Sequence, residues 1–179
     1  MAAALLGAEV AAMEEDSAGV AAVSAVVERE AVGEAMTTKE FISHLDEAKV
    51  LAAIADAERQ TSGEIRVFIS SRAVDDALKH AQQRFEKLGM TRTRERNGVL
   101  LYFAPLSRQF AICGDIGIHE KCGDTFWQST VAEVGDHLRA GNFTEAIVHA
   151  AHRVGALLSE HFPRRHDDQN ELTDEIIRD

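Results

Sequence analysis

Five acidic residues in the middle of the chain have the carboxylates that a hard divalent cation prefers: Glu64, Asp75, Asp76, Asp115 and Asp124. Calcium and magnesium bind several carboxylate and carbonyl oxygens at once. Open α/β sheets bind ligands in the loops at their strand ends, so the four aspartates can meet there as one metal site. The alternative is that Asp124 only caps a helix, and that Asp75 and Asp76 only stabilise a helix start through its dipole.

Three arginines alternate in the loop before Asn97–Gly98: Arg92, Arg94 and Arg96. Arginine is the preferred bidentate partner of phosphate oxygens. Beside a metal ion, Arg94 or Arg96 can hold a phosphoryl group while a metal-bound water attacks it, with Asp115 among the metal ligands. The alternative is a solvated loop in which Glu95 neutralises part of the charge.

Two further sets of side chains suit a transition metal: Cys113, His119 and Cys122, and the helix pair His149 and His152 with His161 beyond it. The first set matches no common zinc-finger spacing and has no evident fourth ligand. A cysteine at a strand end, such as Cys113, is more usually a small buried hydrophobic residue. Histidines three apart share a helix face and can bind a metal, although surface histidines are the commoner interpretation.

The distribution of charge argues against a general nucleic-acid surface. The formal net charge of the 179 residues is −11, of which residues 1–36 carry −6, residues 37–162 carry −2 and residues 163–179 carry −3. Binding to phosphates needs a clear basic face, and the central part of the chain is nearly balanced. The sequence also contains no Walker loop, dinucleotide-binding glycine motif, serine elbow or HExxH motif.

Composition divides the chain into three parts. Residues 1–36 are rich in Ala, Val, Glu and Gly and contain no aromatic residue, which predicts a disordered or loosely helical extension. Residues 37–162 are expected to form one compact domain and residues 163–179 a charged tail. Whether translation starts at Met1 or Met36 stays open. With two cysteines, no signal-peptide pattern and no apolar stretch of about 20 residues, we expect a cytoplasmic protein.

The elements that must position these residues follow from the hydrophobic pattern. Thr37 to Glu40 has the pattern of a capping box, and the continuous apolar run Gly98–Ala104 indicates a strand that is covered on both faces. The expected elements are helix 37–59, strand 64–71, helix 74–88, strand 98–104, strand 109–113, helix 124–138 and helix 142–158. This order, α-β-α-β-β-α-α, predicts a three-layer α/β/α sandwich around a small mixed sheet.

Three stretches carry a resemblance to a known family: Thr61–Ile65, Arg96–Leu101 and Gly114–His119, with Asp124 following. In residue types and spacing they are similar to the TPM domain family, over roughly residues 40–162. The segment Asn170–Ile176 also resembles the tails of short bacterial members. Ile116 departs from the family's pattern, because related short members often place a charged or aromatic residue there.

The resemblance implies the α/β sandwich and two candidate functions. Many bacterial members are similar to accessory modules, some encoded beside membrane-associated proteins of the LemA type; this favours a module that binds a divalent cation and a protein partner, LemA-type or another TPM protein. The alternative is a metal-dependent acid phosphatase acting on phosphomonoesters, an activity associated with some plant members. Asp115 and Asp75 would then ligate the metal, often calcium in this family, and Arg94 or Arg96 would hold the phosphate.

Overall fold

The structure, a computed structural model, describes residues 9–10, 20–26, 35–164 and 175–179. Its helices and strands in chain order are β1 (Glu9–Val10), β2 (Val20–Val26), α1 (Thr38–Ser43), α2 (Glu47–Glu58), β3 (Glu64–Ile69), α3 (Ala77–Lys87), β4 (Gly98–Ala104), β5 (Gln109–Asp115), α4 (Ile116–Arg139), α5 (Phe143–His161) and β6 (Ile176–Arg178). Short 3₁₀ turns at Met90–Arg92 and Pro105–Ser107 precede and follow β4.

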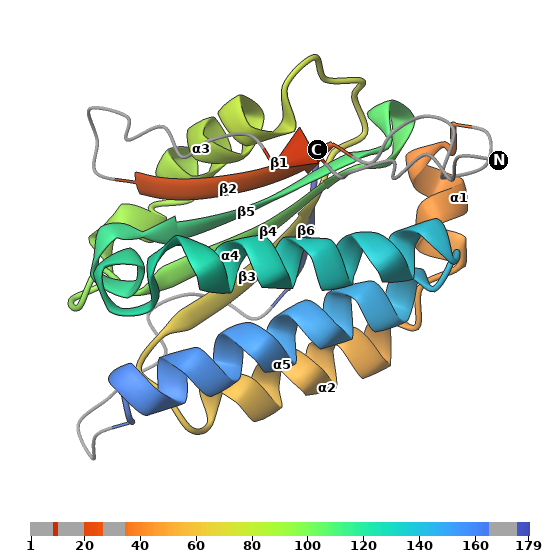
Figure 1. Ribbon diagram of the computed structural model, residues 1–179. Helices are drawn as coiled ribbons and strands as arrows, with labels where there is room; N and C mark the ends of the chain where they lie inside the picture. The colour runs from red at the N-terminus through yellow and green to blue at the C-terminus, as the bar shows by residue number, and fades with distance from the viewer. Residues whose placement is uncertain (1–8, 11–19, 27–34, 165–174) are drawn as a thin grey trace, which may run out of the picture.

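A mixed sheet in the order β1-β2-β5-β4-β3-β6 forms the middle layer. β3 and β4 are parallel, and β4 and β5 form the expected antiparallel hairpin. Helices α2, α4 and α5 cover one face of the sheet and α3 covers the other (Figure 1). The predicted three-layer α/β/α sandwich is confirmed.

The central strand β4 shows why its sequence is apolar without interruption. Val99, Leu101 and Phe103 join the larger core cluster, beneath α2, α4 and α5. Leu100 and Tyr102 join the smaller cluster, beneath α3. Successive side chains of a strand point to opposite faces of the sheet, so a strand between two helical layers needs apolar residues at every position.

Two predicted helices are divided differently in the structure. The expected helix 37–59 is divided into α1 and α2, because Asp46 caps a new start by accepting a hydrogen bond from the Lys49 N–H (3.0 Å). Non-helical dihedral angles at Gly123 (φ 62°, ψ −176°) divide α4 into two helical segments, and the second begins directly after Gly123, where the sequence predicted a helix start at Asp124. The first segment, which begins at Ile116 with Asp115 as its N-cap, was not predicted.

The capping signals at other helix ends are confirmed. Thr37 and Glu40 form both hydrogen bonds of the capping box at the start of α1. Gly89, directly after the C-cap of α3, has a left-handed backbone (φ 71°), the conformation that favours glycine after a helix. Local sequence chemistry therefore decides where these two helices start and stop.

Both flanks of the domain contribute strands to the sheet. Within residues 1–36, expected to be disordered or loosely helical, the structure instead describes β1 and β2, and β2 pairs with β5 along its whole length. In the tail, β6 pairs with β3. Unpaired N–H and C=O groups at a sheet edge favour the addition of a strand, which overrides the weak local signal. The other residues of both flanks lie outside the described part.

Across the described segments, no helix combines the length and apolarity needed to cross a membrane.

Candidate functional site

The expected site residues are divided between two ends of the sheet. Glu64 opposite Gly98 and Val99 opposite Gly114 place the starts of β3 and β4 beside the end of β5, and we call this the Asp115 end. Asp75 follows the other end of β3, near the start of β5, and we call this the Asp75 end. The seven residues of β5 span roughly 20 Å between these ends.

At the Asp115 end, Asp115 and Arg96 form a bidentate ion pair. The Arg96 Nε donates to Asp115 Oδ2 and its Nη2 donates to Oδ1, each at 2.7 Å. Asp115 is fully buried, and its Oδ1 also accepts the N–H of Ile116 (2.7 Å) at the start of α4. Hydrogen bonding to Asp115 is the main reason why the pKa of Arg96 is raised. The pair is therefore fixed in place by both geometry and charge.

The backbone around Arg96 is shaped to present this pair. Arg96 has a left-handed conformation (φ 52°), and its C=O accepts the N–H of Gly117 at 3.0 Å. A Cβ atom on Gly117 would lie 2.5 Å from the Glu95 carbonyl oxygen and 2.7 Å from that of Arg96. Only glycine allows α4 to approach the arginine loop this closely.

A second polar network joins the start of β3 to the same loop. The Ser62 hydroxyl donates to Glu95 Oε2 (2.5 Å), and the side-chain amide of Asn97 donates to Ser62 Oγ (3.1 Å). The Asn97 N–H also donates to Thr93 Oγ1 (3.2 Å), and Asn97 is almost completely buried. The sequence did not indicate Ser62 as a site residue, although Ser62 lies two residues before the buried strand β3 and Asn97 directly before β4.

The remaining predicted residues of this end have different surroundings. Glu64 is the first residue of β3 and is buried. Arg92 and Arg94 are exposed in the loop, and Arg96 is the arginine that contacts Asp115. Of the two arginines predicted to hold phosphate, Arg96 therefore lies beside the predicted catalytic carboxylate of Asp115, and the two side chains form an ion pair.

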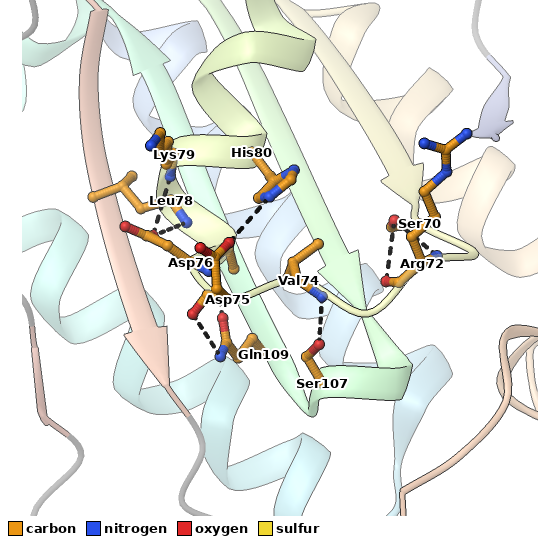
Figure 2. Close-up of polar contacts among 11 residues, drawn as sticks. Ser70, Arg72, Val74, Asp75, Asp76, Leu78, Lys79, His80, Ser107 and Gln109 are labelled. Carbon is orange, nitrogen blue, oxygen red and sulfur yellow. Dashed lines mark hydrogen bonds and ion pairs between the residues drawn. The ribbon is translucent and has the colours of Figure 1, made fainter.

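At the Asp75 end, Asp76 caps α3 (Figure 2). Its Oδ1 accepts the N–H groups of Leu78 (2.9 Å) and Lys79 (3.1 Å). This is the ordinary geometry of an N-cap aspartate, which satisfies helix donors that have no partner in the helix. The sequence left open that Asp76 only stabilises a helix start through the helix dipole, and its contacts show that it stabilises the start of α3 as the N-cap.

Asp75 lies on the surface beside this cap. Its side chain is 88% exposed, and its Oδ1 lies 3.3 Å from His80 Nε2 and accepts the Asp76 N–H at 3.0 Å. Figure 2 shows Gln109 below the turn, where its amide nitrogen donates to the Asp75 carbonyl oxygen (3.4 Å). Hydrogen bonds from the local backbone and from His80 lower the pKa of Asp75. This carboxylate is accessible to solvent.

Asp124 and the sulfur and histidine groups lie elsewhere. Asp124 is 62% exposed, and its Oδ1 is 3.9 Å from His119 Nε2. Burial raises the pKa of the Cys113 thiol strongly and that of Cys122 to about 11. Both cysteines therefore have the character of protonated structural thiols. His149 is engaged with Glu133 (2.6 Å) on the neighbouring helix.

The five acidic residues do not fit a single shared cation site. Within the described ranges, no three His, Cys, Asp or Glu side chains are grouped closely enough to hold a metal ion. Asp75 and Asp76 lie at one end of the sheet and Asp115 at the other, where Arg96 occupies its carboxylate. The expectation that these residues converge is therefore corrected, because β3 and β5 run in opposite directions.

Comparison with known proteins gives two matches. The family model described as TPM domain matches residues 36–157. Among solved structures, the NMR structure of the BA42 protein from the psychrophilic bacterium Bizionia argentinensis is similar, with a TM-score of 0.69 and 34% sequence identity. The match covers 83% of this chain and 98% of BA42. No curated protein matches this sequence significantly.

Proposed function

Because this chain belongs to the TPM domain family, we propose that it is an accessory module whose activity is to bind a partner protein. The observation that carries the proposal is the state of Asp115, the residue on which the alternative phosphatase mechanism depends. Asp115 is fully buried and holds two segments together through Arg96 and Ile116. Its contacts favour a structural role over a catalytic one.

The hydrogen-bonding capacity of Asp115 supports this reading. A carboxylate has about four lone-pair positions, and three hydrogen bonds from Arg96 and Ile116 already use Asp115. One position remains for a metal ion, but an ion there would lie against the positively charged guanidinium of Arg96, which repels it.

The alternative, a metal-dependent acid phosphatase, has a specific geometric requirement. It needs Asp75 and Asp115 on one metal ion, whereas the strand between them spans roughly 20 Å. The observation in its favour is that Arg96 keeps 37% of its side chain exposed beside the loop that also holds Arg92 and Arg94. We rank it second, because an exposed arginine alone supplies phosphate affinity without a nucleophile.

A divalent cation remains part of the proposal at the Asp75 end only. Asp75 is exposed and Asp76 is adjacent, so a calcium or magnesium ion can approach these two carboxylates. Such ions take six or more oxygens, so we expect weak binding completed by water and backbone carbonyls. The check is the melting temperature with added calcium, which should rise slightly for the parent and stay unchanged for Asp75→Asn.

The family resemblance suggests the partner, and the cysteine content suggests the compartment. We propose a membrane-associated protein of the LemA type as partner, or a second TPM protein, bound from the cytoplasm. Two free thiols, Cys113 and Cys122, are consistent with a reducing compartment.

Two assays on the full chain separate the functions. The soluble part of a LemA-type protein from the same genome should bind in a titration by calorimetry. An aryl phosphate with calcium, magnesium, manganese or zinc should not be hydrolysed. The phosphatase reading replaces ours if turnover is seen and falls at least about a hundredfold in Asp115→Asn with the melting temperature unchanged.

A further inference from the structure

The edge of β3 is occupied by a short piece of the same chain. Three residues of β6 pair in parallel with it, in the register Val67 with Ile176, Phe68 with Ile177 and Ile69 with Arg178. Figure 1 shows β6 as the last strand of the sheet, beside β3 and far along the chain from it. Ten residues separate Arg164, after α5, from Glu175, before β6, so β6 is connected to the rest of the domain through these ten residues.

The side chains of β6 enter both layers of the sandwich. Ile176 packs against the larger core cluster and Ile177 against the smaller one. This alternation is what the period of a strand requires. The edge therefore recognises two successive apolar side chains, one on each face of the sheet.

The residue after the strand is held by a cationic clamp. Asp179 Oδ1 accepts the backbone N–H (2.7 Å) and the hydroxyl (3.1 Å) of Ser71, and its Oδ2 pairs with Arg84 and lies 4.0 Å from Arg72 Nε. The Asp179 side chain is only 13% exposed. Next to it, Arg178 pairs with Glu47 of α2 (2.6 Å). Complementary charges thus fix the register of the incoming strand.

We propose that the β3 edge, with the Ser71–Arg72–Arg84 clamp, is the docking site for an extended peptide of a partner protein with the pattern apolar, apolar, basic, acidic, which displaces β6. The partner's strand adds to the sheet by main-chain hydrogen bonds, and the two faces and the clamp supply specificity. This proposal rests on the proposed binding function and names the surface that would carry it.

Competition between β6 and a partner peptide for the β3 edge would regulate how tightly the partner binds. A segment tethered within the same chain typically has an effective concentration on the order of 1 mM. If an open edge binds such a peptide with a Kd of about 100 µM, the tethered β6 weakens the apparent affinity of the free peptide about tenfold. With these values β6 covers the edge for most of the time, and a partner peptide of higher affinity can still replace it.

The test uses the full chain and a labelled peptide with the sequence of residues 175–179, capped at both ends. In one variant, I177D together with D179K removes β6 from competition without changing the edge. Fluorescence anisotropy should show the peptide binding to this tail variant at least about tenfold more tightly than to the parent. The amide signals of Val67 to Ser71 should shift on binding in a ¹H–¹⁵N spectrum.

A charge reversal keeps the test independent of folding. Adding R84E to the tail variant should weaken peptide binding at least tenfold, and a peptide carrying the D179K change should recover it. Three outcomes would overturn the proposal. The peptide could bind equally to the parent and the tail variant, or it could fail to bind at millimolar concentration. The tail variant could also form a dimer that the peptide does not dissociate. If the LemA-type partner still binds an R84E chain with unchanged affinity, the partner function stands and the edge is not its site.

Discussion

The two ends of the β3–β4–β5 sheet carry the same kind of side chain in opposite surroundings. Asp115 is fully buried, pairs with Arg96 in a bidentate geometry and starts α4. Asp75 is 88% exposed and has His80 and its own turn as neighbours. A carboxylate by itself indicates neither a metal site nor a structural pair, and its burial and partners decide between them. At the Asp115 end the ion pair connects the arginine loop to the start of α4, while the Asp75 end is open to solvent and to other molecules.

The largest effect that separates the two ends is expected for Asp115→Ala. The change leaves the Arg96 guanidinium and the Ile116 N–H without their acceptor, and removing one partner of a buried pair typically costs about 3–5 kcal/mol. Since 37% of the Arg96 side chain is exposed, we expect a value near the lower limit, about 3 kcal/mol. Urea unfolding monitored by circular dichroism measures it.

Asp75→Ala is the matched control at the other end, and it should change the free energy of unfolding by less than about 0.5 kcal/mol, as exposed substitutions usually do. Similar losses of unfolding free energy in the two variants would contradict the contrast between a structural ion pair and an open surface. A loss below about 1 kcal/mol for Asp115→Ala would show that the pair is not structural.

Next in size is Gly117→Ala, which tests the close approach at the Asp115 end. Alanine is the better helix former by about 1 kcal/mol, but its Cβ would lie 2.5 Å from the backbone oxygen of Glu95. Backbone cannot move aside as a flexible side chain can, so we expect a net loss of about 2 kcal/mol. Gly135→Ala in the same helix is the control, because its nearest neighbour is the Arg139 guanidinium (3.3 Å), which can shift. Thermal unfolding should give opposite signs for the two changes.

The fold was predictable where the signal is local. The unbroken apolar run Gly98–Ala104 has one simple explanation, a strand between two layers, and the Thr37–Glu40 pattern marks a helix start through its own hydrogen bonds. The helix start after Gly123 was predicted, but the preceding segment of α4 was missed, because Gly114 and Gly117 on either side of Asp115 indicate a break rather than a helix start. The strands β2 and β6 depend on edges that only the assembled sheet offers.

The site was less predictable because it depends on strand direction. Asp75 follows the carboxyl end of β3 and Asp115 that of β5, so the two meet only if these strands are parallel. The sequence indicates the hairpin between β4 and β5, but the parallel pairing of β3 with β4 follows from the crossover through α3. Two strands joined through a helix are usually parallel, and this rule together with the hairpin places Asp75 and Asp115 at opposite ends of the sheet. The Ser62–Asn97 network had no such signal beyond its position before two strands.

A smaller effect is expected for Asp76→Ala at the Asp75 end. The change removes the acceptor for the N–H groups of Leu78 and Lys79, and loss of an N-cap usually costs about 1 kcal/mol. Asp76→Asn should cost only a few tenths of that, since asparagine is an equally good cap. Asp76→Asn also separates a metal role from the cap, because it would then abolish a calcium-induced rise in melting temperature while leaving the cap intact.

The smallest effect is expected for the pH dependence of the clamp that binds Asp179 at the Asp75 end of the sheet. Burial alone would raise the pKa of Asp179, but hydrogen bonds from Ser71 and the charges of Arg84 and Arg72 outweigh it and lower the pKa. A carboxylate with a lowered pKa in the folded state contributes stability that is fully present above its ordinary value of about 3.9. That contribution is lost as the pH falls from there through the lowered pKa.

Because Arg72 is 79% exposed, we expect this contribution to stability to be at most about 0.5 kcal/mol. The Ser71 amide shift should therefore titrate with a midpoint below pH 4, and the transition should be absent in Asp179→Asn. A midpoint at or above the ordinary value would mean that the clamp does not hold Asp179 as an anion, and the Asp75 end would then lack the cationic docking feature that distinguishes it from the closed pair at Asp115.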